Sequence, residues 1–169
     1  MKILETDRLV IRHLTTDDTA FILELLNEPS FIQNIGDRNV RTEDDAKKYL
    51  LNGPIESYDK HGFGLFMVEL KDMSEPIGMC GLLKRDNLPD VDVGFAFLPK
   101  YWMKGYAFES ASAILKYAKG TCGLKRILGI VNPDNAASIH VLEKLGLKYE
   151  SMVKMPHDNF EIKLFAVNL

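Results

Sequence analysis

The sequence predicts a mixed α/β or α+β domain built around one sheet. Its 169 residues are a typical length for one domain, and 46% hydrophobic with 27% charged residues is an ordinary globular composition. Apolar runs of strand type alternate with segments of helical period in the order β-αα-βββ-α-β-α-ββ. We therefore expect residues 1–169 to form a single domain, and a chain of this length can bury a sizeable core without covalent cross-links.

Helix caps and helix breakers define the elements of the first half. Thr16 and Thr42 are each followed by acidic residues, which is typical of a helix start, and Pro29 is expected to end the first helix. An Asn-Gly-Pro stretch at 52–54 interrupts the second helical segment. The expected order is a strand over 8–14, a helix from 16 to the break at 29, a loop from Phe31 to Arg41, a helical segment from 42 to 52, and a half-helix that ends at 60–62.

Strand patterns dominate the second half. Ala107 and Ala111 lie on the inner face of a long helix, where small residues allow close packing on a sheet. The expected order is a hairpin of strands over 63–70 and 77–83, a third adjoining strand over 90–98, the long helix over 105–119, a buried strand over 126–131, a last helix that Asn135 caps, and strands over 147–153 and 160–167.

The charge balance argues against nonspecific nucleic-acid binding. Lys and Arg total 21 against 24 Asp and Glu, which gives a net charge of -3, whereas such binding needs a basic surface. Residues 1–8 are charged where a secretory signal would be apolar, and no uncharged apolar run approaches the ~20 residues of a membrane span. We expect a cytoplasmic protein with no membrane partner, either a monomer or a homodimer.

The cysteines and histidines do not form a metal-ligand pattern. Cys80 and Cys122 belong to no Cys-x-x-Cys pair and are expected to be buried, reduced thiols. The sequence contains no triphosphate-binding, dinucleotide, zinc-protease, serine-hydrolase or EF-hand motif, so we expect no metal. The four histidines are scattered singly and are expected to be surface or packing residues: His13, His61, His140 and His157.

The stretch from Phe97 to Ala107 contains the most informative local pattern. A strand runs there into a Gly-containing turn, and the free amides of that turn open a long helix. Unpaired N–H groups at the positive end of a helix dipole form an anion site. Gly105 would let a diphosphate approach the backbone, and Lys104 would add positive charge. The other interpretation is that Gly105 only permits a tight turn, and the fragment by itself leaves both open.

Three segments of the chain, taken together, resemble one protein superfamily. The segment from Val93 to Glu109 resembles the acetyl-coenzyme-A-binding motif of the GNAT superfamily of N-acetyltransferases, and the segment from Asn135 to Lys148 is similar to that family's second motif. The opening Glu-Thr-Asp-Arg-Leu-Val-Ile-Arg at 5–12 resembles the signature of the RimJ/RimL-type branch, the ribosomal-protein-alanine acetyltransferases and their relatives. The resemblance implies a GNAT-like acyl-CoA N-acyltransferase fold, with a mostly antiparallel sheet splayed at the cofactor site.

The resemblance also assigns residues to acetyl-CoA (acetyl-coenzyme A), the implied co-substrate. The backbone of Phe95, Ala96 and Phe97 would pair with the pantetheine arm. Asn135 would hydrogen-bond the pantetheine, a role compatible with its simpler role as a helix N-cap. The amides that would cradle the pyrophosphate are those of Met103, Lys104, Gly105, Tyr106, Ala107 and Phe108.

Two positions depart from the superfamily pattern. Trp102 stands where the superfamily usually has Arg or Gln, although Trp is familiar there in the RimJ/RimL-type branch. Leu142 stands where many relatives carry the Tyr that protonates the departing thiolate. Ser138, one helical turn earlier on nearly the same face, is the candidate substitute, and the alternative for it is a small polar residue that packs near the cofactor.

The implied reaction is direct attack of a neutral amine on the thioester, with backbone donors of the splayed strand stabilising the oxyanion. An amine with a pKa of roughly 8–10 must first lose a proton, so a carboxylate is expected nearby. Asp92 matches a position where relatives often carry an acid, and Glu69 on the neighbouring strand is the reserve. The alternative for both is a solvated strand acid.

The acceptor is expected to bind between the 31–41 loop with its following helix and the turn from Met155 to Asn159. A peptide N-terminus, an amino acid, an aminoglycoside-like drug and a polyamine remain open, and the branch resemblance favours a peptide N-terminal amine. A second function is a catalytically silent member that binds acetyl-CoA as a sensor or interaction module, because Leu142 cannot protonate a thiolate. A third is a different anion-binding α/β domain.

Overall fold

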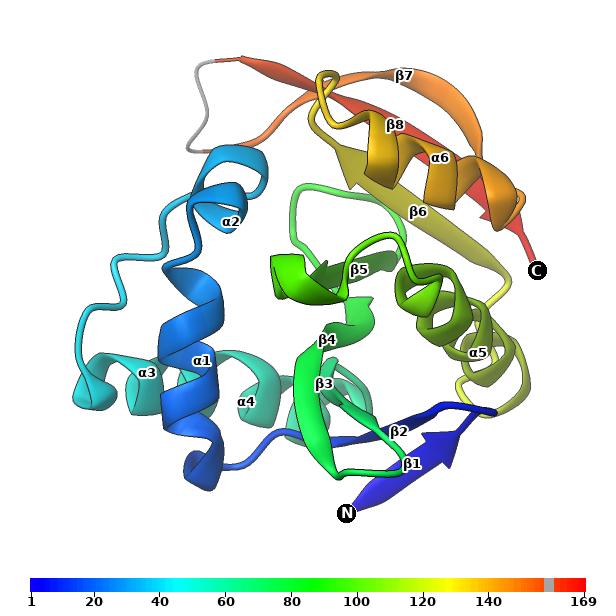
Figure 1. Ribbon diagram of the computed structural model, residues 1–169. Helices are drawn as coiled ribbons and strands as arrows, with labels where there is room; N and C mark the ends of the chain where they lie inside the picture. The colour runs from blue at the N-terminus through cyan, green and yellow to red at the C-terminus, as the bar shows by residue number, and fades with distance from the viewer. Residues whose placement is uncertain (157–159) are drawn as a thin grey trace.

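A computed structural model describes residues 1–156 and 160–169, which form an eight-stranded sheet in the order β1-β2-β3-β4-β5-β6-β8-β7 (Figure 1). Neighbouring strands are antiparallel except β5 and β6, which are parallel. This confirms the predicted mixed, mostly antiparallel fold class. The strands are β1 (Lys2–Glu5), β2 (Leu9–His13), β3 (Leu65–Leu70), β4 (Glu75–Leu83), β5 (Asp92–Phe97), β6 (Arg126–Val131), β7 (Lys148–Lys154) and β8 (Glu161–Asn168).

Helices cover both faces of the sheet (Figure 1). On one face, Leu25 and Leu50 pack with Met79 of the sheet in a buried cluster. On the opposite face, Ala111 and Leu142 belong to a second cluster. The helices are α1 (Thr19–Leu26), α2 (Pro29–Asn34), α3 (Glu43–Leu50), α4 (Glu56–His61), α5 (Tyr106–Gly120) and α6 (Ala136–Lys144), with the short turns η1 (Thr16–Asp18), η2 (Leu51–Ile55) and η3 (Pro99–Tyr101).

Three local expectations were wrong. Residues 2–5 form an additional strand, β1, because a bulged four-residue pairing with β2 is too short to show a period in the sequence. The predicted 31–41 loop begins inside a helix, since Pro29 occupies the first turn of α2. The stretch at 52–54 does not interrupt the helix: η2 is a π-helical turn, whose wider spacing accommodates the missing N–H and the ring of the buried Pro54.

The sheet splays between β5 and β6. Their register contains one pair, Asp92 with Leu128, and the Leu128 N–H donates to the Val91 carbonyl at 2.9 Å. By contrast, β6 stays paired with β8 from Arg126 to Val131. Beyond Asp92, β5 therefore has a strand partner only on its β4 side in the described part of the chain. The predicted splay is confirmed, and Asp92 lies at its apex.

Both cysteines are free thiols. Cys80 is buried as predicted, whereas Cys122 is only half-buried. Among the helices of residues 1–156 and 160–169, none combines the length and the apolar character needed to cross a bilayer.

Candidate active site

The open edge of β5 presents peptide groups to the splay. The Leu98 N–H donates to the Ile77 carbonyl of β4 at 3.0 Å, whereas the Val91 carbonyl accepts from β6. Because peptide groups of successive strand residues point to alternate sides, those of Phe95 and Phe97 face the gap. Those of Ala96 face β4, with which it pairs through Met79. The strand thus offers the N–H and carbonyl of Phe95 and the N–H of Phe97 to an extended ligand.

The turn after β5 presents a row of free amides. Met103 and Gly105 have positive φ angles of 61° and 84°, and residues 102–105 are exposed. Gly105 is the N-cap of α5, and the first helical bond to it comes from the Glu109 N–H at 3.0 Å. In the part of the chain that the structure describes, no acceptor is found for the amides from Met103 to Phe108. Such a run at a helix start binds anions, so the local pattern that Gly105 indicated is present.

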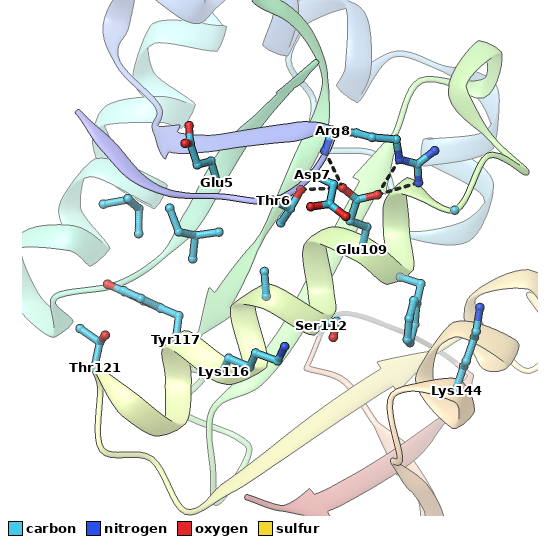
Figure 2. A pocket seen from close by; sticks show the side chains of 15 residues that line it. Glu5, Thr6, Asp7, Arg8, Glu109, Ser112, Lys116, Tyr117, Thr121 and Lys144 are labelled. Carbon is cyan, nitrogen blue, oxygen red and sulfur yellow. Dashed lines mark hydrogen bonds and ion pairs between the residues drawn. The ribbon is translucent and has the colours of Figure 1, made fainter. Parts of the chain in front are cut away.

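An ion-pair network fixes this turn to the N-terminal hairpin (Figure 2). The Arg8 guanidinium pairs with Glu109 at 2.6 Å and donates to the Lys104 carbonyl at 2.9 Å. The Thr6 hydroxyl donates to the same carboxylate at 2.6 Å. Burial raises the pKa of Glu109, but the hydrogen bonds from Thr6 and Arg8 outweigh it and hold that pKa below its ordinary value. The network orients the turn from which the free amides project.

A groove of about 860 Å³ runs between this hairpin and the outer face of α5. Gly105 is among the residues that line it, as are Lys116 and Lys144, whose long side chains Figure 2 shows. The groove adjoins the predicted anion turn but does not include the splay between β5 and β6. We therefore place the candidate site at the splay and the turn, where the unpaired backbone groups gather.

Trp102 ties the turn back to β5. Its indole N–H donates to the Phe97 carbonyl at 2.8 Å, while 47% of the residue stays exposed. The side chain therefore covers the end of the open strand edge, and it positions the turn without supplying a charge.

Asp92 is a buried carboxyl on the face that α1–α3 cover. Its side chain points to the same side of β5 as that of Ala96, which packs in the buried cluster under α1, α2 and α3. Val93 points to the other side and packs in the cluster under α5. Asp92 is 1% exposed, and its Oδ1 accepts from the Nε of Arg85 at 3.0 Å. Burial raises its pKa to about 6, against the opposing effect of the Arg85 charge. A carboxyl of this kind is a suitable base near neutral pH.

The start of α6 flanks the splay from the opposite face. The Asn135 side chain accepts from the Ser138 N–H at 3.2 Å, so its expected N-cap role is confirmed. Leu142 is 2% exposed and packs against Gly129, where an added Cβ would lie 2.8 Å from the leucine. Leu142 is therefore a core residue, and Ser138 lies one helical turn closer to the open part of β6.

The family model for the acetyltransferase (GNAT) domain matches residues 8–148. The chain belongs to the GNAT acetyltransferase family. The uncharacterised N-acetyltransferase YnaD of Bacillus subtilis (strain 168) is 31% identical over 151 residues, which cover 89% of this chain and 85% of YnaD. The family membership confirms the resemblance to the GNAT superfamily, and the chain is an N-acetyltransferase of the GNAT type.

Solved structures share the whole fold. A GNAT-family acetyltransferase from Bacillus anthracis is 29% identical with a TM-score of 0.80, and the match covers 99% of this chain and 98% of that one. RimL, a ribosomal α-N-protein acetyltransferase in complex with coenzyme A, is 14% identical with a TM-score of 0.86, and the match covers 100% and 98% of the two chains. The second likeness shows a common fold.

The GNAT fold does not bring Glu69 to Asp92. Glu69 pairs with Pro76 of β4, whereas Asp92 pairs with Leu83. Seven residues along a strand correspond to roughly 23 Å. Arg12 also holds the Glu69 carboxylate at 3.1 Å. Glu69 is therefore not a neighbour of the splay apex.

The acceptor side of the GNAT site is described in part. The predicted turn from Met155 to Asn159 lies largely outside the described residues, as does His157 entirely. Met155 itself accepts a hydrogen bond on its sulfur from the Asn87 side chain at 3.3 Å. The loop between β4 and β5, which carries Arg85 and Asn87, therefore lies beside the start of that turn.

Sequence reasoning missed two contacts of this GNAT site. Glu109 and Arg8 are 101 residues apart, and the sequence showed them only as part of two separate motifs. No motif singles out Arg85, although a basic residue in the loop before a strand acid is a usable signal. Arg85 contacts Asp92, the predicted base, and Arg8 contacts Glu109, the last residue of the predicted cofactor motif.

Proposed function

We propose that the chain is an acetyl-CoA-dependent N-acetyltransferase that acetylates a primary amine by direct attack. The observation that carries the proposal is the splay of β5 from β6 next to the free amides of Met103–Phe108. An extended arm with a diphosphate fits this combination, because strand-like pairing and backbone anion binding are both available there.

The residues present fit acetyl-CoA as a co-substrate. Phe95 and Phe97 would pair with the pantetheine arm through the peptide groups that face the gap, with Ala96 between them. Asn135 would reach the arm from α6. The amides of Met103, Lys104, Gly105, Tyr106, Ala107 and Phe108 would hold the pyrophosphate, and Gly105 leaves the approach open. The bound co-substrate supplies an activated thioester carbonyl.

Proton transfer is divided between the two faces of the sheet. On the α1–α3 face, Asp92 accepts the proton of the incoming ammonium group, so that a neutral amine can attack. On the α5–α6 face, the Ser138 hydroxyl donates a proton to the departing thiolate. The thioester would lie in the splay between these faces. The base can therefore act on the attacking nitrogen and the donor on the departing sulfur, from opposite sides of the thioester carbon.

The acceptor class remains a proposal within the family. The structural likeness to RimL favours a peptide N-terminal amine, and a small-molecule amine is the other candidate. Cytoplasmic location and a monomeric or homodimeric state are predictions from the sequence that accompany this proposal.

The test is release of coenzyme A thiol from acetyl-CoA with a panel of amines, followed by mass spectrometry for one added acetyl group. We expect turnover with at least one amine of the panel. Tight coenzyme A binding without turnover on peptides, amino acids, polyamines and aminoglycosides would contradict the enzyme and support the silent sensor. Absence of a thermal shift with coenzyme A would contradict both.

Replacing Ser138 by Ala is expected to lower kcat by about 100-fold, the lower end of what general acid catalysis contributes, while the KM for acetyl-CoA stays unchanged. Ser112→Ala on α5 is the matched control, since it removes a hydroxyl from the groove side of the fold. An unchanged kcat in Ser138→Ala would assign thiolate protonation to water.

A further inference from the structure

Arg85 lies beside the proposed base and is partly exposed. It donates to the buried Asp92 through Nε at 3.0 Å, and its side chain is 29% exposed. Neither Nη1 nor Nη2 has an acceptor within residues 1–156 and 160–169. These two amino groups form the fork with which arginine binds carboxylates. The residue thus holds the proposed base with one edge and leaves its carboxylate-binding edge available.

Arg38 is a second arginine of this half of the chain. Burial raises the pKa of the Tyr49 hydroxyl on α3, and the positive charges of Arg38 and Arg85 both oppose that effect. Arg38 is exposed in the segment after α2 and has no ion-pair partner among the described residues. Its neighbour Arg41 differs, since Asp37 holds it at 2.6 Å.

Asp92 is the acid that pairs with Arg85 in the described part of the chain. Asp86 follows Arg85 but makes no ion pair with it there, and Asp90 lies 3.5 Å from Arg126. The Nη1 and Nη2 edge of Arg85 therefore meets no carboxylate of the described residues.

The charge of Arg85 disfavours a simple ammonium group. An amine bearing only positive charge would approach Asp92 beside the Arg85 guanidinium, which repels it. An amine that also bears a carboxylate would place that group on the free fork while its nitrogen reaches Asp92. Both charges of such an acceptor are then paired with opposite charges of the site.

We infer that the acceptor is an amine with a carboxylate close to the reacting nitrogen, and that Arg85 binds that carboxylate. The inference rests on the proposed acetyltransferase function and specifies its acceptor. The carboxylate has two possible sources, the α-carboxylate of a free amino acid or the side chain of an acidic residue next to a peptide N-terminus.

The experiment compares acids with matched neutral amides as acceptors. The proteinogenic L-amino acids are assayed against their α-carboxamides, and short peptides with Asp or Glu at the second position against the same peptides with Asn or Gln. For the wild-type chain we expect kcat/KM to be at least tenfold higher for the acid of one of these two sets. The set that shows the preference identifies the source of the carboxylate.

Arg85→Gln is expected to reduce this preference about tenfold or more, mainly through the KM of the acid, because the fork is lost. Arg85→Lys should restore part of it through its charge. Arg126→Gln is the matched control, since Arg126 is also a partly buried, ion-paired arginine, and it should leave the preference unchanged.

Two results would overturn the inference. Equal kcat/KM for acids and amides in the wild-type chain would show that the site recognises no acceptor carboxylate, while the acetyltransferase function would still stand. If the preference persists in Arg85→Gln and both acceptors are slowed equally, Arg85 only positions Asp92 and does not bind the acceptor carboxylate. Absence of turnover with every amine would instead contradict the proposed function itself, and the inference with it.

Discussion

Replacing Asp92 by Asn lowers kcat/KM by about 10²–10⁴-fold, the range that a positioned general base contributes. The reason is geometric: Asp92 is a buried carboxyl at the apex of the splay, on the face where the acceptor would enter. The measurement is thiol release at saturating acetyl-CoA with the best amine of the panel. Asp90→Asn is the matched control, because Asp90 lies two residues earlier and is 38% exposed beside Arg126.

The pH profile separates a base from a structural role. Burial raises the pKa of Asp92 to about 6, so the wild-type kcat/KM should fall with an inflection near pH 6 as the carboxylate gains a proton. The Asn variant should lack this inflection and keep only the pH dependence of the amine. The same inflection in both proteins would show that another group is the base.

Stability should change in the opposite direction to activity. The pKa of Asp92 is higher in the folded chain than its ordinary value of 3.8, so ionising it costs stability. This cost is absent below pH 3.8 and fully present above about pH 6. The difference corresponds to roughly 3 kcal/mol at most, and Asp92→Asn should therefore unfold at an equal or higher temperature at pH 7.5. A variant inactive because it unfolds would contradict this reading.

The hydrophobic pattern of the sequence predicted the long, regular elements and missed the short or irregular ones. The apolar face of α5 and the paired central strands could be predicted because each repeats its hydrophobic pattern over enough residues to identify the element. The four-residue β1, the helix that begins at Pro29 and the π turn at Pro54 were not, since each depends on a tertiary partner. Only after β1 and β2 pair does residue 2 become part of a strand.

The candidate site divides in the same way. The anion turn was predictable because its chemistry is local: Gly105, the strand before it and the helix after it are contiguous. The partners of Asp92 and Glu109 were not, because Arg85 meets Asp92 through the path of a loop and Arg8 crosses 101 residues to Glu109. Strand alternation puts Asp92 and Ala96 on one face of β5, but only the fold shows which helices cover that face.

Gly105→Glu is expected to raise the Kd for coenzyme A more than 100-fold, a loss of at least about 2.7 kcal/mol. The new side chain would begin 3.3 Å from the Arg8 guanidinium and would add a negative charge to the turn that carries the free amides. It would therefore repel the diphosphate. Isothermal titration with coenzyme A measures the effect, and an unchanged Kd would remove the pyrophosphate assignment.

Two further variants separate charge from backbone strain. Gly105 has a φ of 84°, so any side chain there is strained by about 1–2 kcal/mol. Gly123→Glu adds the same charge and a comparable strain at a φ of 67°, but with open space around it and at the other end of α5. This control should bind coenzyme A as the wild-type chain does. Gly105→Gln should weaken binding less than Gly105→Glu, because the neutral side chain competes for the amides without repelling the diphosphate.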